Sequence, residues 1–168
     1  PLSLKQSGPA RIVTLSKNAN ERNFTLGQQD DTLEFRLRTT DTSINGIPAV
    51  NSPAKSLREK LTHVVYTRSR NGTARIFVDG RQRAQRQVAG GMSNWDENFQ
   101  LALADELTGG RTWRGELHLV AIYSRDLSPA EVDQNFLAGP KGTNRAGMLA
   151  AKAAQPDRFE TQIAPILS

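Results

Sequence analysis

Hydrophobic and polar residues alternate with a period of two along most of this chain. In the segment 32–39, Leu33, Phe35 and Leu37 fall on one face of a strand and charged residues fall on the other. Such alternation is typical of strands that bury one face in an antiparallel sheet. The same pattern predicts further strands at 11–15, 23–28, 61–68, 74–78, 99–103 and 115–123. The last of these is long and apolar enough for a strand that is covered on both faces.

Two glycine turns predict how three of these strands connect. Asn71 and Gly72 lie between two predicted strands, where a type I′ turn needs positive φ at both central residues. Asp79 and Gly80 repeat the signal one strand later, so we expect a hairpin that continues into a three-stranded meander. Concentrations of turn-forming residues predict long loops at 40–60, 89–98 and 105–114.

One helix has clear boundaries. Ser128 suits the N-cap, Pro129 suits the first helical position, and Glu131 completes a capping box. Gly139 and Pro140 end the helix. We therefore expect an all-β protein of two stacked antiparallel sheets with one short C-terminal helix.

Composition limits the chemistry that the chain can perform. It has 168 residues, a net charge of +5 and no cysteine, so it holds no disulfide, no thiolate nucleophile and no covalently attached haem. The charge gives weak attraction for anions. Its densest cluster, Arg81, Arg83 and Arg86, has no neighbouring aromatic residue for base stacking, so we expect a solvated strand face and no nucleic-acid partner. No apolar run approaches the roughly 20 residues of a membrane span.

Several motifs between residues 11 and 139 occur together in one known fold family. They are the hairpin from Leu61-Thr-His-Val-Val-Tyr66 to Ile76-Phe-Val-Asp-Gly80, the segment Gly115-Glu-Leu-His-Leu-Val-Ala-Ile-Tyr123, and the helix start Arg125-Asp-Leu-Ser-Pro-Ala-Glu-Val132. Their combination resembles the concanavalin A-like, laminin G-like jelly rolls. The resemblance implies a jelly-roll sandwich over residues 1–140, which lacks the first strands of that family.

The tail carries a second resemblance. Phe159-Glu-Thr-Gln-Ile-Ala-Pro-Ile-Leu-Ser168 resembles the opening helix of planctomycete-type cytochrome c modules, in which a Cys-x-x-Cys-His haem site follows. This implies a linker at 141–157 and the truncated start of a cytochrome c-like domain at 158–168. Haem c would then belong to the missing downstream domain alone, and the protein would be extracytoplasmic: periplasmic, cell-surface or secreted.

The catalytic patterns of this fold are missing, so we expect no enzyme activity and name no catalytic residue. Its glycoside hydrolases carry Glu-x-Asp-x-x-Glu or Glu-x-Asp-x-Glu on one strand, and neither pattern occurs here. Asp105 and Glu106 are adjacent, and adjacent strand residues point to opposite faces. His63 and His118 form neither a triad nor a metal site. A hydrolase is therefore the least favoured alternative.

Candidate binding residues lie in or beside the predicted loops, where recognition is commonly placed. Trp95, between Asn94 and Asp96, and Trp113, near Arg111, offer indole faces for a sugar ring together with polar groups for its hydroxyls. The alternative, and the more common one, is that each tryptophan caps an end of the core.

Charged residues give two further candidates. Arg36 and Arg38 share a strand face and could clamp a carboxylate or sulfate, although a plain solvated face is the simpler explanation. Laminin G-like domains often bind calcium, and Asp96, Asp105 and Glu106 could supply oxygen ligands for Ca²⁺, without any diagnostic spacing. Apart from this calcium, we expect no cofactor in the fragment.

These observations predict a non-catalytic, lectin-like recognition module that binds carbohydrate or a protein partner within an exported, haem-containing protein. The alternative is a structural spacer or protein-interaction domain that positions the redox domain.

Overall fold

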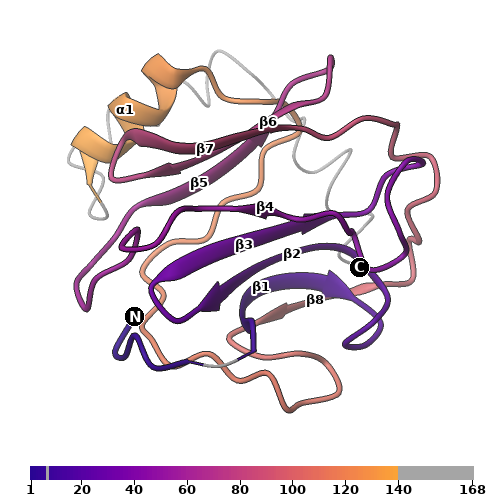
Figure 1. The fold of residues 1–168 in the computed structure, drawn as a ribbon, viewed down its shortest axis with the longest axis horizontal. Coiled ribbons are helices and arrows are strands. Elements are labelled where there is room, and N and C mark those ends of the chain that lie inside the picture. The colour runs from indigo at the N-terminus through magenta and orange to yellow at the C-terminus, as the bar shows by residue number, and fades with distance from the viewer. Residues whose placement is uncertain (7, 140–168) are drawn as a thin grey trace, which may run out of the picture.

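Two antiparallel β-sheets stack face to face in the computed structural model, which describes residues 1–6 and 8–139 (Figure 1). The strand order is β4-β3-β2-β1-β8 in the larger sheet and β5-β6-β7 in the smaller one. The elements are β1 (Ala10–Ser16), β2 (Arg22–Gln29), β3 (Thr32–Leu37), β4 (Val50–Asn51), β5 (Val64–Arg68), β6 (Thr73–Val78), β7 (Arg81–Gln87), β8 (Gln100–Leu103) and α1 (Pro129–Ala138). The all-β, two-sheet prediction with one short helix is confirmed.

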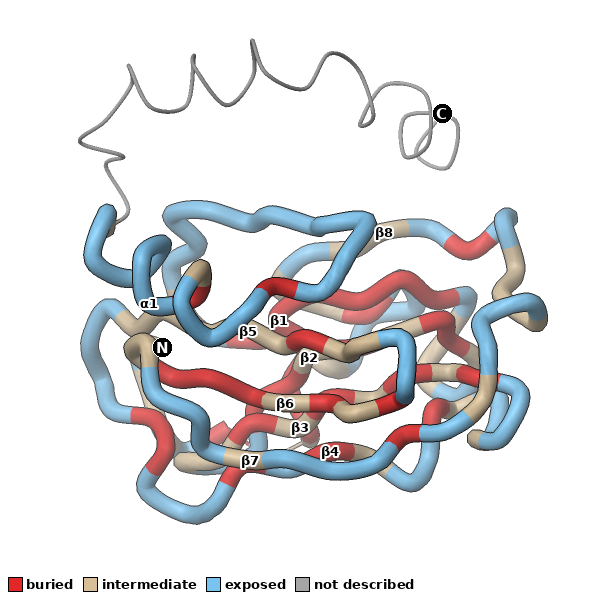
Figure 2. Tube along the Cα trace, turned by 90° about the horizontal axis from the view of Figure 1, so that it is seen from above, coloured by how far each residue is buried: buried red, intermediate tan, exposed pale blue. Residues whose placement is uncertain are grey.

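One hydrophobic core lies between the sheets. Alternate residues of β3 are buried, as their period of two requires, and they meet alternate buried residues of β6. Phe35 of β3 stacks on Tyr66 of β5, with ring centroids 3.5 Å apart. Figure 2 shows the buried residues along β1 and β6, while β7 at the edge of its sheet is exposed.

The predicted meander is present, with one difference in its first turn. Strands β5, β6 and β7 pair in sequence order. Asp79 and Gly80 both have positive φ, 51° and 75°, as the predicted type I′ turn requires. Between β5 and β6, positive φ occurs at Gly72 alone, and its N–H donates to the carbonyl of Ser69 over 2.9 Å. That geometry is a type I turn followed by a glycine bulge.

The strand predicted at 115–123 is wrong. This segment has no strand pairing with the described residues of either sheet, and it leads as an orange coil to α1 in Figure 1. Leu119 is 67% exposed and Tyr123 is 52% exposed, so the expected burial on both faces is wrong as well. An apolar alternating sequence becomes a strand only where a sheet edge supplies ladder partners, and this segment has not joined either edge.

The predicted helix boundaries are confirmed. The Ser128 hydroxyl accepts a hydrogen bond from the Glu131 N–H, and the Glu131 carboxylate accepts one from the Ser128 N–H. Val132 is fully buried and packs with Leu127 against Phe77, which fixes α1 on the small sheet. No helix within residues 1–6 and 8–139 is long and apolar enough to cross a membrane. The linker and the cytochrome c-like start predicted beyond Gly139 lie outside the described residues.

Candidate functional site

Two loops lie against each other at one end of the sandwich, one within the larger sheet and one that connects the smaller sheet to the larger. The first is the β3–β4 loop, residues 38–49, and the second is the β7–β8 loop, residues 88–99. The Thr40 N–H donates to the Gly91 carbonyl over 2.9 Å, and the Asn94 amide donates to the Thr39 carbonyl over 2.9 Å. These bonds hold the two loops together, so the rim at this end has a fixed shape.

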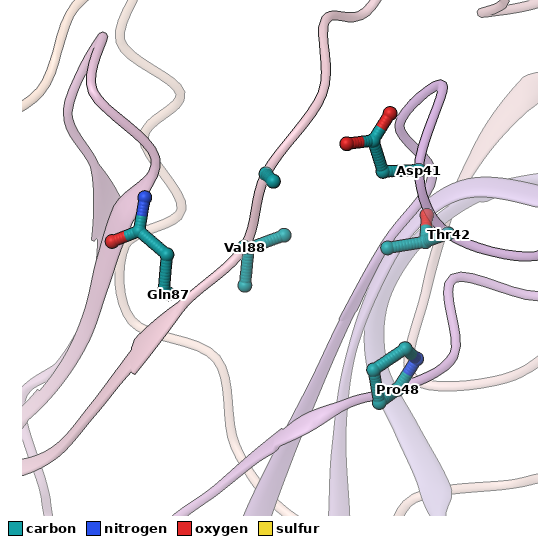
Figure 3. Close-up of a pocket in the computed structure, with 6 residues that line it drawn as sticks. Asp41, Thr42, Pro48, Gln87 and Val88 are labelled. Carbon is teal, nitrogen blue, oxygen red and sulfur yellow. The ribbon is translucent and has the colours of Figure 1, made fainter.

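A shallow pocket of about 180 Å³ opens where these two loops meet the end of β7, and we call it the rim pocket. Figure 3 shows one wall from the β3–β4 loop and another from β7 and the residues that follow it. The lining residues are Asp41, Thr42, Pro48, Gln87, Val88 and Ala89. A carboxylate, a hydroxyl and an amide therefore surround a small apolar floor.

Internal hydrogen bonds fix much of this pocket. The Thr42 hydroxyl donates to the Leu37 carbonyl over 2.8 Å and accepts from the Thr39 N–H over 2.7 Å. Val88 is buried and forms part of the floor. Asp41 is exposed and forms no ion pair within the described residues, so its carboxylate can accept hydrogen bonds from a ligand.

Three of the predicted binding residues lie on the β7–β8 loop at this end. Trp95 is half-buried, its indole N–H donates to the Arg38 carbonyl over 2.7 Å, and its ring packs at 6.1 Å from that of Phe24. Asn94 has a buried Oδ1 without a hydrogen-bond partner among the described residues. The Asp96 carboxylate accepts two hydrogen bonds from Asn98, which lower its pKa. Trp95 thus serves as an anchor for the loop.

Trp113 lies in the core, away from this rim. It is 6% exposed, and its indole N–H donates to the Gln28 side chain over 2.7 Å. Arg111, two residues earlier, donates to the Gly8 carbonyl over 2.9 Å. Stacking of a sugar on Trp113 is incompatible with this burial. Trp113 therefore follows the alternative in which the tryptophan caps an end of the core. The two tryptophans do not form one platform.

A buried charge cluster occupies the region after β8. Glu106 lies 3.1 Å from Arg11 and 4.0 Å from Arg22, and all three side chains are buried. Ser16 also donates to the Glu106 carboxylate. Burial lowers the pKa of Arg22 to about 10, which leaves it charged at neutral pH. Glu106 is therefore a structural counter-ion.

The acids proposed for calcium do not gather into one site. Asp96 precedes β8, whereas Asp105 and Glu106 follow it, and Glu106 is already bound by two arginines. The Asp105 carboxylate accepts from the Thr112 hydroxyl and from the Arg111 N–H, which lowers its pKa. Ca²⁺ takes about six to eight oxygen ligands. Within the part of the chain that the structure describes, no group of three acidic or histidine side chains could hold a metal ion, so these residues do not fit calcium.

Arg36 of β3 and Arg38, which follows the end of β3, are already engaged. Arg36 contacts Glu34 at 2.5 Å and donates to Asn45 over 3.0 Å, so its guanidinium has partners inside the protein. The Arg38 guanidinium lies over the ring of Phe99, 5.9 Å from its centroid. Both side chains are half-buried. A bidentate clamp would require Arg36 to exchange these contacts for a ligand.

The residues of the rim pocket were not among the sequence candidates. The turn-rich segment 40–60 indicated a loop, and Asp41 and Pro48 belong to it. Gln87, however, reaches the same pocket from β7, and no periodicity in the sequence relates it to Asp41. The sequence indicated only that segment 40–60 is a loop. The position of Gln87 on the opposite wall of the rim pocket follows only from the fold.

A comparison with protein-family models identifies the superfamily of this chain. Residues 1–133 match a laminin G family model described as the concanavalin A-like lectin/glucanases superfamily, and the chain belongs to that superfamily. No curated protein matches the chain. Among solved structures, an S-layer domain-containing protein (residues 221–444) from Clostridium thermocellum aligns with a TM-score of 0.36 and 16% identity. The alignment covers 80% of this chain and 66% of that one, so the chain spans just under two thirds of its length.

Proposed function

We propose that this domain is a non-catalytic, lectin-like module that binds a saccharide in the rim pocket. The observation that carries the proposal is the composition of that pocket, where the Asp41 carboxylate lies beside an apolar floor at Val88 and the Gln87 side chain lines the opposite wall. The Gln87 amide already donates to the Asn71 carbonyl, and its second N–H and its oxygen lone pairs remain for a ligand. Sugar hydroxyls need such acceptors and donors, and the apolar face of a sugar ring needs such a floor. Pockets for drug-sized ligands measure about 300 Å³ or more. A cavity of about 180 Å³ suits one terminal sugar unit.

The same pocket argues against hydrolysis. Glycosidases place two carboxyl groups about 5 to 10 Å apart on either side of the scissile bond. Asp41 is the single carboxylate among the described residues that line the rim pocket. A lone carboxylate can hold a hydroxyl, and it has no second group to act as acid or nucleophile. This supports recognition without catalysis.

A glycan array, followed by titration of the strongest ligand, tests the proposal. We expect Asp41→Asn and Gln87→Ala each to weaken binding by about tenfold, or roughly 1.4 kcal/mol. Asp41→Asn replaces a charged acceptor by a neutral amide, and Gln87→Ala removes the amide. Glu97→Gln is the matched control, since Glu97 is exposed on the β7–β8 loop outside the pocket. It should bind as the wild type does. The proposal fails if no glycan binds, or if both pocket variants keep full affinity.

A second candidate function, docking of a protein partner, is favoured by the exposed apolar segment 115–123. Leu119 and Tyr123 expose more than half of their surface, which is costly in water unless another surface covers them. The double variant L119S/Y123S should then lose binding to the separately expressed downstream domain and keep glycan binding. Equal binding by the variant and the wild type would exclude this segment as the docking surface.

We also propose that the domain acts outside the cytoplasm beside a haem-containing domain. The support is the similarity of the tail at 159–168 to the start of a cytochrome c module. The full reading frame should encode an export signal and a Cys-x-x-Cys-His motif after Ser168. A reading frame without that motif would remove the redox context and leave the binding proposal intact.

A further inference from the structure

A buried arginine lies on the face of the larger sheet that points away from the hydrophobic core. Thr25 of β2 stands between Phe24 and Leu26, which pack against the core, so the Thr25 hydroxyl points to the opposite face. Arg22 donates to this hydroxyl over 3.0 Å, which places its guanidinium on the same face. The Arg22 side chain nevertheless has no exposed surface. Loops and neighbouring side chains therefore enclose its charge.

The acidic groups around Arg22 do not balance the positive charge there. Glu106 lies 3.1 Å from Arg11 and 4.0 Å from Arg22, so one buried carboxylate serves two buried guanidinium groups. The charges of Arg36 and Glu34 also act on Arg22, and these two side chains form a pair of their own at 2.5 Å. Three arginines and two glutamates leave this cluster with a net charge of +1. A buried charge without a counter-ion is costly.

One hydrogen-bond donor of Arg22 has no acceptor. Its Nη1 donates to Thr25, and its Nη2 donates to the Ala19 carbonyl. Its Nε is buried and has no hydrogen-bond partner among the residues that the structure describes. The guanidinium stays protonated in proteins, so this N–H remains a donor. An anion at this point would supply both the acceptor and the negative charge.

Burial limits the size of such an anion. Arg22 and Ser16 are 0% exposed and Thr25 is 1% exposed, so a polymer or an organic acid cannot reach the Nε of Arg22. The Thr14 and Thr25 hydroxyls lie 2.6 Å apart and bond to each other, which makes the surroundings polar. A water molecule can accept one hydrogen bond here, but it leaves the excess charge in place. A monoatomic anion meets both requirements.

We infer that Arg22 binds a halide ion, chloride under ordinary conditions, at its Nε in the interior of the domain. The ion accepts the hydrogen bond from Nε and brings the cluster to neutrality. The site forms only in the folded chain, because Arg22 comes from β2, Arg11 from β1 and Glu106 from the segment after β8. An ion that binds the folded state alone stabilises it in proportion to the logarithm of its concentration above its Kd.

Thermal unfolding of the whole chain at constant ionic strength tests this inference, with sodium chloride replaced stepwise by sodium gluconate. Gluconate is too large for a buried site, and constant ionic strength keeps general charge screening unchanged. We expect Tm to rise by about 4 °C for each tenfold increase in chloride above its Kd. Bromide should act as chloride does. Equal Tm values in chloride and gluconate would overturn the inference and leave water as the partner of Arg22.

Two arginine variants separate this site from a general salt effect. Arg22→Met should lose the chloride dependence, because it removes both the donor and the excess charge. Arg75→Met is the matched control, since Arg75 lies on β6 of the other sheet and donates to Gln85, and it should keep the dependence. A dependence that persists in Arg22→Met would overturn the inference.

Bromide in crystals of the wild-type protein gives an answer even if Arg22→Met does not fold. We expect an anomalous scattering peak within hydrogen-bond distance of the Arg22 Nε. Bromide peaks at the protein surface alone would contradict the assignment.

Discussion

Glu106 compensates two buried arginines, and its replacement should show how much the fold depends on it. Glu106→Gln leaves Arg11 and Arg22 without a buried anion. Breaking a buried ion pair by removing one partner costs about 3–5 kcal/mol. Chemical unfolding should show a loss of this size, whereas the exposed Glu97→Gln should change the free energy of unfolding by less than about 0.5 kcal/mol. Similar stabilities for both variants would mean that Glu106 is hydrated in solution.

His63 should make the fold sensitive to mild acid. Its side chain is half-buried against Phe136 of α1, and burial lowers its pKa below the ordinary 6.5. The unfolded chain therefore takes up a proton near pH 6.5 while the folded chain stays neutral, so stability falls as the pH drops below that value. Each pH unit between the two pKa values costs at most about 1.4 kcal/mol.

Unfolding curves between pH 7 and pH 5.5 measure this loss. His63→Gln should flatten the dependence, because it removes the group that titrates differently in the two states. His118→Gln is the control, since His118 is exposed and should leave the dependence as it is in the wild type. A slope that persists in His63→Gln would assign the acid sensitivity to other groups.

Single residues show why the sequence suggested suitable residue types for a binding site but did not predict which of them are buried. Trp113 has the right chemistry for a sugar platform, but its indole is fixed by Gln28, 85 positions away. Glu106 has the right chemistry for calcium, but its carboxylate is paired with Arg11, 95 positions away. Residue type is local information, whereas burial is decided by partners that only the fold brings together.

Elements with local signals were predictable from the sequence. Asp79 and Gly80 specify their turn by themselves, and Ser128 with Glu131 specifies the start of α1 within four residues. The segment 115–123 has the alternating pattern of a strand, but a strand forms only if a sheet edge far away in the sequence supplies its backbone hydrogen bonds. Its prediction failed for that reason.

The exposed segment 115–123 should contribute little to stability by itself. L119S/Y123S should change the free energy of unfolding by less than about 0.5 kcal/mol, because both side chains already face solvent. The buried Leu33→Ala, in contrast, should cost about 2–5 kcal/mol. Amide hydrogen exchange should be fast throughout 115–123. Strong protection of these amides would show that the segment forms a strand in solution.

At the scale of the whole molecule, the fold could be predicted from the sequence, whereas the rim pocket could not. The alternation in β3 indicated a sheet that buries one face against a second sheet, and its alternate residues are buried as expected. Strand β1, in contrast, is buried at all seven positions, so both of its faces are covered. The rim pocket arises where the β3–β4 loop meets the end of β7, from opposite sheets. No local sequence pattern indicates that the β3–β4 loop and the end of β7 come together.

Amide chemical shifts during titration with the strongest array glycan test the central claim most directly. If the domain recognises a saccharide at the rim pocket without transforming it, the shifts should concentrate at residues 40–48 and 87–96, and the saccharide should be recovered intact. Shifts spread over the outer face of the larger sheet, or a cleaved saccharide, would contradict the account.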